Sequence, residues 1–145
     1  MARDAAEIAR LSADAMWSGD KASQGLGMEV LEAGSGHARL AMTVTDRMLN
    51  GHGSCHGGFI FSLADSAFAF ACNSHGQTAV AQQCTITYVM PGRLGMRLVA
   101  DAQERHLGER SGIYDVTVRD ETGAVIAEFR GHSRTLAASL IDKDE

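Results

Sequence analysis

Hydrophobic residues follow two periods along the chain: a helical one near the N-terminus and in the middle of the chain, and an alternating one in two segments before residue 46 and throughout the chain after residue 77. Residues 3–18 carry apolar side chains three or four positions apart, which is the spacing of one face of a helix. A short turn or helical piece follows and ends near the glycines at 25–27. We therefore expect an amphipathic N-terminal helix.

A second, more apolar segment occupies the middle of the chain. From His56 to about Ser74, phenylalanine, alanine, isoleucine, leucine and serine cover almost every side of a helical projection, which predicts a helix that is buried on most sides. The segment carries one charge, Asp65, and it is short for a membrane span. We expect a buried helix and no membrane partner.

Six segments have the alternation or the β-branched content of strands. They cover residues 28–33, 37–45, 79–90, 96–106, 112–120 and 124–135, with turn signals between them. This order predicts an α+β fold in which a curved antiparallel sheet wraps one long central helix, with the N-terminal helix added. We expect one domain over residues 1–145, with a disordered acidic tail from about 138.

Composition narrows the possible partners. The net charge is −5 without a cluster of lysine or arginine, which argues against nucleic acid. The three cysteines, Cys55, Cys72 and Cys84, are sparse and odd in number, as in a reduced, cytoplasmic protein. The first 17 residues have mixed charges and lack the apolar stretch of a secretory signal.

The candidate chemistry lies where a polar, glycine-rich loop, residues 50–58, meets the central helix. Backbone amides at a helix start lack partners inside the helix and form an electropositive site. Gly57 and Gly58 leave room for a substrate carbonyl to approach these amides. Burial of the Asp65 carboxylate is costly unless it is paired or hydrogen-bonded, and a sequence that accepts this cost invites a functional explanation. We therefore interpret Asp65 as nucleophile or general base.

Spacing along the helix predicts an assembly. Gly57 and Asp65 are eight residues apart, about 12 Å along a helix axis. One carbonyl has to lie roughly 3 Å from both groups, which a single helix is unlikely to allow. Two antiparallel copies related by a two-fold axis bring Gly57 of one subunit to Asp65 of the other. We therefore expect an obligate homodimer with two symmetric sites.

These residues resemble the hotdog-fold acyl-CoA thioesterases, specifically the PaaI-type group of phenylacetate degradation. The resemblance spans nearly the whole chain. It is carried by Met48-Leu49-Asn50-Gly51-His52, Ser54-Cys55-His56-Gly57-Gly58, Phe61-Ser62-Leu63-Ala64-Asp65 and Ala71-Cys72-Asn73-Ser74, with Cys84-Thr85-Ile86 and Pro91-Gly92 downstream.

The resemblance implies hydrolysis of coenzyme A thioesters, with phenylacetyl-CoA and its ring-hydroxylated forms as substrates. It implies that Asp65 is the catalytic carboxylate, that the Gly57 N–H polarises the carbonyl, and that Asn50 and His56 line the site. It also implies a homotetramer built as a dimer of dimers, with no cofactor and no metal.

Further substrate contacts are expected from the same comparison. Several relatives carry a hydroxyl residue on the next strand, whereas this chain reads Ala81-Gln82-Gln83-Cys84, so we assign Gln83 to that position. Gly58 and the phenylalanines Phe59, Phe61 and Phe68 are expected to contact the acyl group. Three arginines, Arg93, Arg130 and Arg134, are candidate contacts for the phosphates of coenzyme A.

Other interpretations of the same residues stay open. Cys55 beside His56 suggests a cysteine nucleophile, and His52, Cys55 and His56 have the side chains of a zinc site. The chain as a whole is also compatible with a non-catalytic acyl-CoA-binding module or with a hotdog-fold hydratase or dehydratase. Measured turnover separates a binding module from an enzyme.

Overall fold

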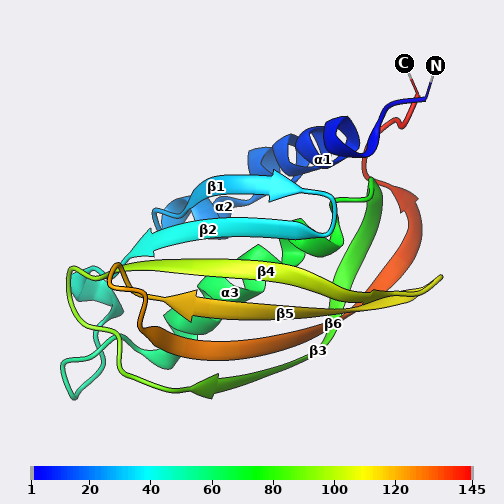
Figure 1. Cartoon of the computed structure of the whole chain (residues 1–145). Helices are drawn as coiled ribbons and strands as arrows, with labels where there is room; N and C mark the ends of the chain where they lie inside the picture. The colour runs from blue at the N-terminus through cyan, green and yellow to red at the C-terminus, as the bar shows by residue number, and fades with distance from the viewer. Residues whose placement is uncertain (1, 145) are drawn as a thin grey trace.

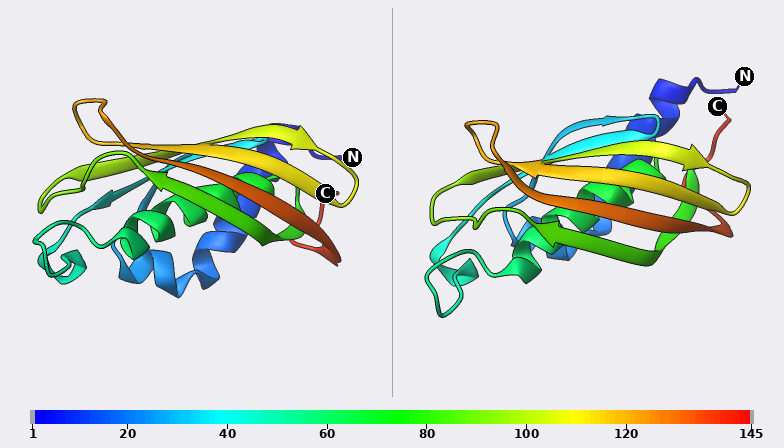
Figure 2. Two further views of the ribbon diagram at one scale, coloured as in Figure 1. Left: turned by 90° about the horizontal axis from the view of Figure 1, so that it is seen from below. Right: turned by 60° about the horizontal axis from the view of Figure 1, so that its bottom comes forward.

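A computed structural model describes residues 2–144 and shows one six-stranded sheet with three helices on one of its faces (Figures 1 and 2). The helices are α1 (Ala5–Gly19), α2 (Lys21–Gly25) and α3 (Gly57–Cys72), with a 3₁₀ turn, η1 (Asp46–Met48). The strands are β1 (Glu29–Gly34), β2 (His37–Thr43), β3 (Gln77–Tyr88), β4 (Arg97–Leu107), β5 (Ser111–Arg119) and β6 (Val125–Ser139). Their order in the sheet is β1-β2-β4-β5-β6-β3, and all neighbours are antiparallel.

The core lies between the sheet and α3. In β5 every second residue is buried, because successive side chains of a strand point to opposite faces. The buried set from β5 and β4 meets a side of α3 that carries mostly small residues, among them Ala64, Ala67 and Ala71. Small side chains let the helix approach the sheet closely, which explains how this alanine-rich helix packs on the strands.

One glycine of β6 makes room for the largest side chain on the sheet-facing side of α3. Phe68 is 1% exposed and lies edge-on to Tyr114, with 5.6 Å between ring centroids. A Cβ at Gly131 would lie 2.7 Å from the Phe68 ring. Gly131 is therefore required by the close approach of helix and sheet.

Three surfaces of the molecule are left partly open. All three helices lie on the same face of the sheet, and within residues 2–144 the opposite face carries no helix (Figure 2). On α3, residues 61, 62, 65, 66 and 69 are only partly buried. β3 is an edge strand with residues exposed on both faces, although it is 12 residues long. A long edge strand offers unpaired backbone groups to another chain.

The predicted α+β architecture is confirmed, with strand and helix ends that differ by a few residues from the predicted ones. The largest difference is at the C-terminus, where β6 continues to Ser139 instead of ending at 135. We expected disorder from about residue 138, whereas the structure has an ordered backbone as far as Asp144. There Ala2 bridges Asp144, and the Arg3 N–H donates to the Lys143 carbonyl at 3.1 Å. Glu145 lies outside the described residues.

No helix within residues 2–144 combines the length and the apolar character that crossing a membrane requires.

Candidate active site

The loop before α3 is held by its own backbone and by Asn50. The Asn50 Oδ1 accepts from the N–H groups of His52 at 2.9 Å and Ser54 at 3.2 Å, while its Nδ2 donates to the Ser54 hydroxyl at 3.2 Å. The His56 N–H donates to the Met48 carbonyl at 2.7 Å. Asn50 thus shapes the turn that brings the chain into α3, and one of its amide hydrogens is left for another partner.

His56 caps the helix and leaves one amide free beside it. Its Nδ1 accepts from the Gly58 N–H at 2.9 Å, so the neutral ring carries its proton on Nε2. Within residues 2–144, the Gly57 N–H donates no hydrogen bond. The start of α3 therefore presents the free Gly57 N–H, with the exposed His56 side chain as a neighbouring donor.

Tyr88, at the end of β3, is a site residue that the sequence did not reveal. Its hydroxyl donates to the Gly57 carbonyl at 2.8 Å. A Cβ at Gly57 would lie 2.9 Å from Tyr88 Cζ, so any larger residue would force this ring to move. The strand end and the helix start lie far apart in sequence, which is why no local motif marks the contact.

Asp65 lies two turns into α3 on its partly open side. No arginine, lysine or histidine of residues 2–144 forms an ion pair with it. Burial, and then the nearby carboxylate of Asp20, raise the pKa of Asp65 above its usual range. A carboxylate with a raised pKa is a stronger base, as a general base or nucleophile requires.

Cys84 of β3 is half-buried and packs against the core, and burial, followed by the charge of Asp65, raises the pKa of its thiol. Gln83 lies on the other face of the sheet, in a cavity with His106 and His132. A bulge between residues 81 and 83 offsets the alternation here. Within one chain the structure does not bring Gln83 to Asp65.

The phenylalanines expected to contact the substrate separate into two groups. Phe68 was expected to contact the acyl group, but it is buried in the core between α3 and the sheet, with 5.8 Å between its ring centroid and that of Phe129. It therefore faces away from the open side of α3. Phe61 is half-buried, with its ring 5.5 Å from Phe129. Phe59 is half-buried next to His56, at 6.1 Å between ring centroids. Only Phe59 and Phe61 lie at the edge of the open side, where Gly58 is also exposed.

The cysteine and zinc interpretations gain no support. Cys55 is 5% exposed, and burial raises the pKa of its thiol, which disfavours the thiolate that a nucleophile needs. Cys72, near Asp65, has its pKa raised to about 12 by burial. Among the residues that the structure describes, no three histidine, cysteine or acidic side chains gather as a metal would require.

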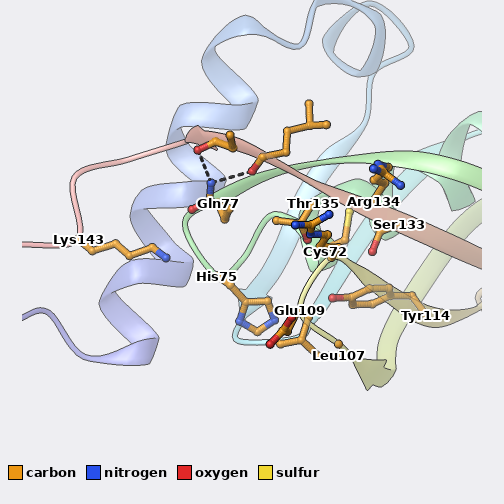
Figure 3. Close-up of a pocket in the computed structure, with 14 residues that line it drawn as sticks. Cys72, His75, Gln77, Leu107, Glu109, Tyr114, Ser133, Arg134, Thr135 and Lys143 are labelled. Carbon is orange, nitrogen blue, oxygen red and sulfur yellow. Dashed lines mark hydrogen bonds between the residues drawn. The ribbon is translucent and has the colours of Figure 1, made fainter.

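Two cavities flank α3. A cavity of about 350 Å³ adjoins the helix start, between Gly57, Ile60 and Tyr88. A larger one, about 660 Å³, lies at the other end of the helix (Figure 3). There Gln77 donates to the carbonyls of Leu136 and Ala137 at 2.8 and 2.9 Å.

The larger cavity is lined by three cations, Arg110, Arg134 and Lys143, none of which forms an ion pair within residues 2–144. By contrast, Arg130, a predicted phosphate contact, is already paired with Asp115, with Nε 2.6 Å from Oδ1. The larger cavity is therefore a more favourable place for an anion than the surface around Arg130.

Residues 52–127 match the family model described as the thioesterase superfamily. The chain belongs to that superfamily. It is 46% identical to the acyl-coenzyme A thioesterase PaaI of Escherichia coli strain K12 over 129 residues, which are 89% of this chain and 92% of that protein. The predicted hotdog fold and the predicted enzyme class, a thioesterase of the PaaI type, are thereby confirmed.

Solved structures agree with this assignment. The E. coli PaaI protein from the phenylacetic acid degradation operon superposes with a TM-score of 0.92 at 44% identity, over 94% of this chain and 99% of that one. A Streptococcus mutans protein solved with bound acetyl-CoA superposes with a TM-score of 0.73 at 29% identity, over 81% of this chain and 91% of that one.

Proposed function

We propose that this thioesterase hydrolyses phenylacetyl-CoA and ring-hydroxylated phenylacetyl-CoA to the free acid and coenzyme A. One observation carries the proposal: a free amide at the start of α3 and an unpaired carboxylate of raised pKa stand on the same helix. The similarity to a PaaI protein of a phenylacetic acid degradation operon supports the aryl-acetyl group. The acetyl-CoA bound to the Streptococcus mutans relative supports a coenzyme A ester.

The site is shared between two subunits. Gly57 and Asp65 are too far apart along α3, about 12 Å, to act on one carbonyl. The long β3 edge and the partly open side of α3 are suited to a two-fold contact, in which strands pair and helices run antiparallel. Asp65 then faces Gly57 of the partner subunit, and two such dimers form the tetramer.

Hydrolysis starts when the thioester carbonyl accepts a hydrogen bond from the Gly57 N–H. The negative charge that develops on this oxygen is stabilised there, a contribution that is typically worth about 10²–10³ in rate for one donor. The proton on His56 Nε2 and the remaining amide hydrogen of Asn50 are the donors that orient the carbonyl or a water molecule. No metal or cofactor takes part.

Asp65 acts in one of two ways. As a nucleophile it forms an anhydride with the acyl group while the carbon–sulfur bond breaks, and water then releases the acid. As a general base it takes a proton from the water that attacks. In both routes the sulfur leaves as the thiolate of coenzyme A, which then takes up a proton. Hydrolysis in ¹⁸O-water under single turnover separates the routes, because only the anhydride route leaves label in the Asp65 carboxyl.

The two ends of the substrate have separate contacts. Phe59 and Phe61 provide aromatic surface for the phenyl ring at the edge of the open side of α3. The phosphates of coenzyme A bind in the larger cavity, which Glu109 also lines and where Arg110 and Arg134 form no ion pair within residues 2–144 (Figure 3).

The test is release of free thiol from a panel of phenylacetyl-, hydroxyphenylacetyl-, benzoyl- and short aliphatic CoA esters, with native protein and Asp65→Asn. We expect selective turnover of the first two esters, lost in an Asp65→Asn variant that keeps its fold and oligomeric state. Preference for aliphatic esters would contradict the substrate. Tight binding of these esters without turnover would indicate a binding module.

A further inference from the structure

A chain of hydrogen bonds joins α2 to α3 next to Asp65. The Ser23 hydroxyl donates to Asp20 Oδ2 at 2.6 Å, and the Ser23 N–H donates to Asp20 Oδ1 at 3.0 Å. The Ser23 oxygen also lies 2.8 Å from the Ser66 hydroxyl oxygen. Ser66 follows Asp65 directly on α3, so this series of hydrogen bonds ends at the residue next to the candidate catalytic aspartate.

The direction of these hydrogen bonds follows from the number of protons. A serine hydroxyl has one hydrogen, and that of Ser23 is directed to Asp20. Ser66 must therefore donate to Ser23, and the chain runs from Ser66 through Ser23 to the Asp20 carboxylate. Ser23 is 2% exposed, so this connection is shielded from water. It holds a carboxylate at the junction of α1 and α2 in a defined position against α3.

The charge of Asp20 is not neutralised by a neighbour. Within residues 2–144, Asp20 forms no ion pair with arginine, lysine or histidine. Three titratable groups are found close to Asp65: Asp20, Cys84 of β3 and Cys72 of α3. The two thiols are neutral at pH 7, because burial raises the pKa of each. Burial is the first cause of the raised pKa of Asp65, and Asp20 is the charged group that raises this pKa further.

We propose that Asp20 is a positioning residue for catalysis: Ser23 and Ser66 hold its charge against α3, and this charge shifts the pH range in which Asp65 reacts. The inference rests on the proposed function of Asp65 and extends it to α2. A like charge nearby makes the Asp65 carboxylate more basic. The same charge causes Asp65 to be protonated, and so to lose its reactive form, at a higher pH. The short helix α2 therefore contributes an electrostatic element to the active site.

The variant that tests this is Asp20→Asn, because asparagine caps a helix about as well as aspartate and retains an oxygen for Ser23. The pH dependence of kcat/KM is measured with the best CoA ester. We expect the acidic limb to move to lower pH and the rate on the plateau to fall. Asp14→Asn is the matched control, since Asp14 is exposed on α1 and its loss changes the net charge equally. The proposal would be overturned if the acidic limb of the kcat/KM profile lay at the same pH in Asp20→Asn and Asp14→Asn.

One further measurement separates this inference from the fold and from the proposed function. Protein labelled with ¹³C at aspartate carboxyls gives the titration of Asp65 by NMR, assigned with Asp65→Asn, whether or not the protein is active. An Asp65 titration that moves to lower pH in Asp20→Asn supports the inference even if no ester is hydrolysed, and an unmoved titration overturns it.

Discussion

The contact between Tyr88 and the start of α3 makes Gly57→Ala the most informative single substitution. The added Cβ would lie 2.9 Å from Tyr88 Cζ and 3.0 Å from its hydroxyl oxygen, where carbon atoms normally stay about 3.5–4.0 Å apart. The ring has to move by roughly 0.5–1 Å, which breaks its hydrogen bond to the Gly57 carbonyl.

The expected effect on stability is small. Loss of the Tyr88 hydrogen bond costs about 1 kcal/mol, while alanine gains up to about 1 kcal/mol over glycine in a helix. The ring is 48% exposed and can move aside. The net change in the free energy of unfolding should therefore stay within about 1 kcal/mol in urea titrations.

The expected effect on activity is large. A displacement of about 1 Å in a positioning group costs on the order of 10²-fold, and one lost oxyanion donor costs about 10²–10³. We expect kcat/KM for thiol release to fall by about 10–100-fold. Gly51→Ala, in the same loop with no atom within 4 Å of its added Cβ, is the control and should stay active.

A double variant tests the steric cause. Tyr88→Ala removes the ring, so in the Gly57→Ala background it should restore part of the lost activity, and a double-mutant cycle measures this coupling. The reasoning is refuted if Gly57→Ala is as active as Gly51→Ala, or if the double variant recovers nothing.

Three other predictions follow from the structure. Gly131→Ala places a Cβ 2.7 Å from the buried Phe68 ring and should lower the free energy of unfolding in urea by about 1–3 kcal/mol, whereas a change as small as that of Gly51→Ala would contradict this packing. Because the pKa of Asp65 is raised on folding, its ionised form lowers stability at pH 7 and this penalty disappears as the pH falls below the usual value of 3.8. Asp65→Asn should therefore unfold at higher urea than the native protein at pH 7 but not near pH 3, and equal stability at pH 7 would argue against the burial of this carboxylate. Dialysis against EDTA should leave the rate of thiol release unchanged; a loss that zinc restores would point to a metal site.

The fold was accessible from the sequence because its signals are local. The apolar segment of α3 and the alternation in β5 both report burial within a single element. The strand ends were less predictable, since β6 continues past 135 by pairing with β3, a contact between segments about 60 residues apart.

The site was predictable only where one short segment builds it. The loop at Asn50, the cap at His56 and the glycines at the start of α3 are all contained in one motif. Tyr88 and Asp20 were missed, because each reaches the site through tertiary packing from a distant element. The role of Gln83 stays a prediction, and the bulge in β3 that places it could not be foreseen, because it is a property of the pairing with β6 that composition does not report.

The claim that most needs a direct test is that Gly57 and Asp65 of different subunits form one site. Co-expression of Asp65→Asn and Gly57→Ala chains in equal amounts gives mixed dimers, in which one of the two shared sites has both native residues. Random pairing then predicts about a quarter of the native activity, from two chains that are nearly inactive alone. If both residues act within one subunit, every site in the mixture carries a defect and the activity stays at the level of the parent variants, which would contradict the shared site.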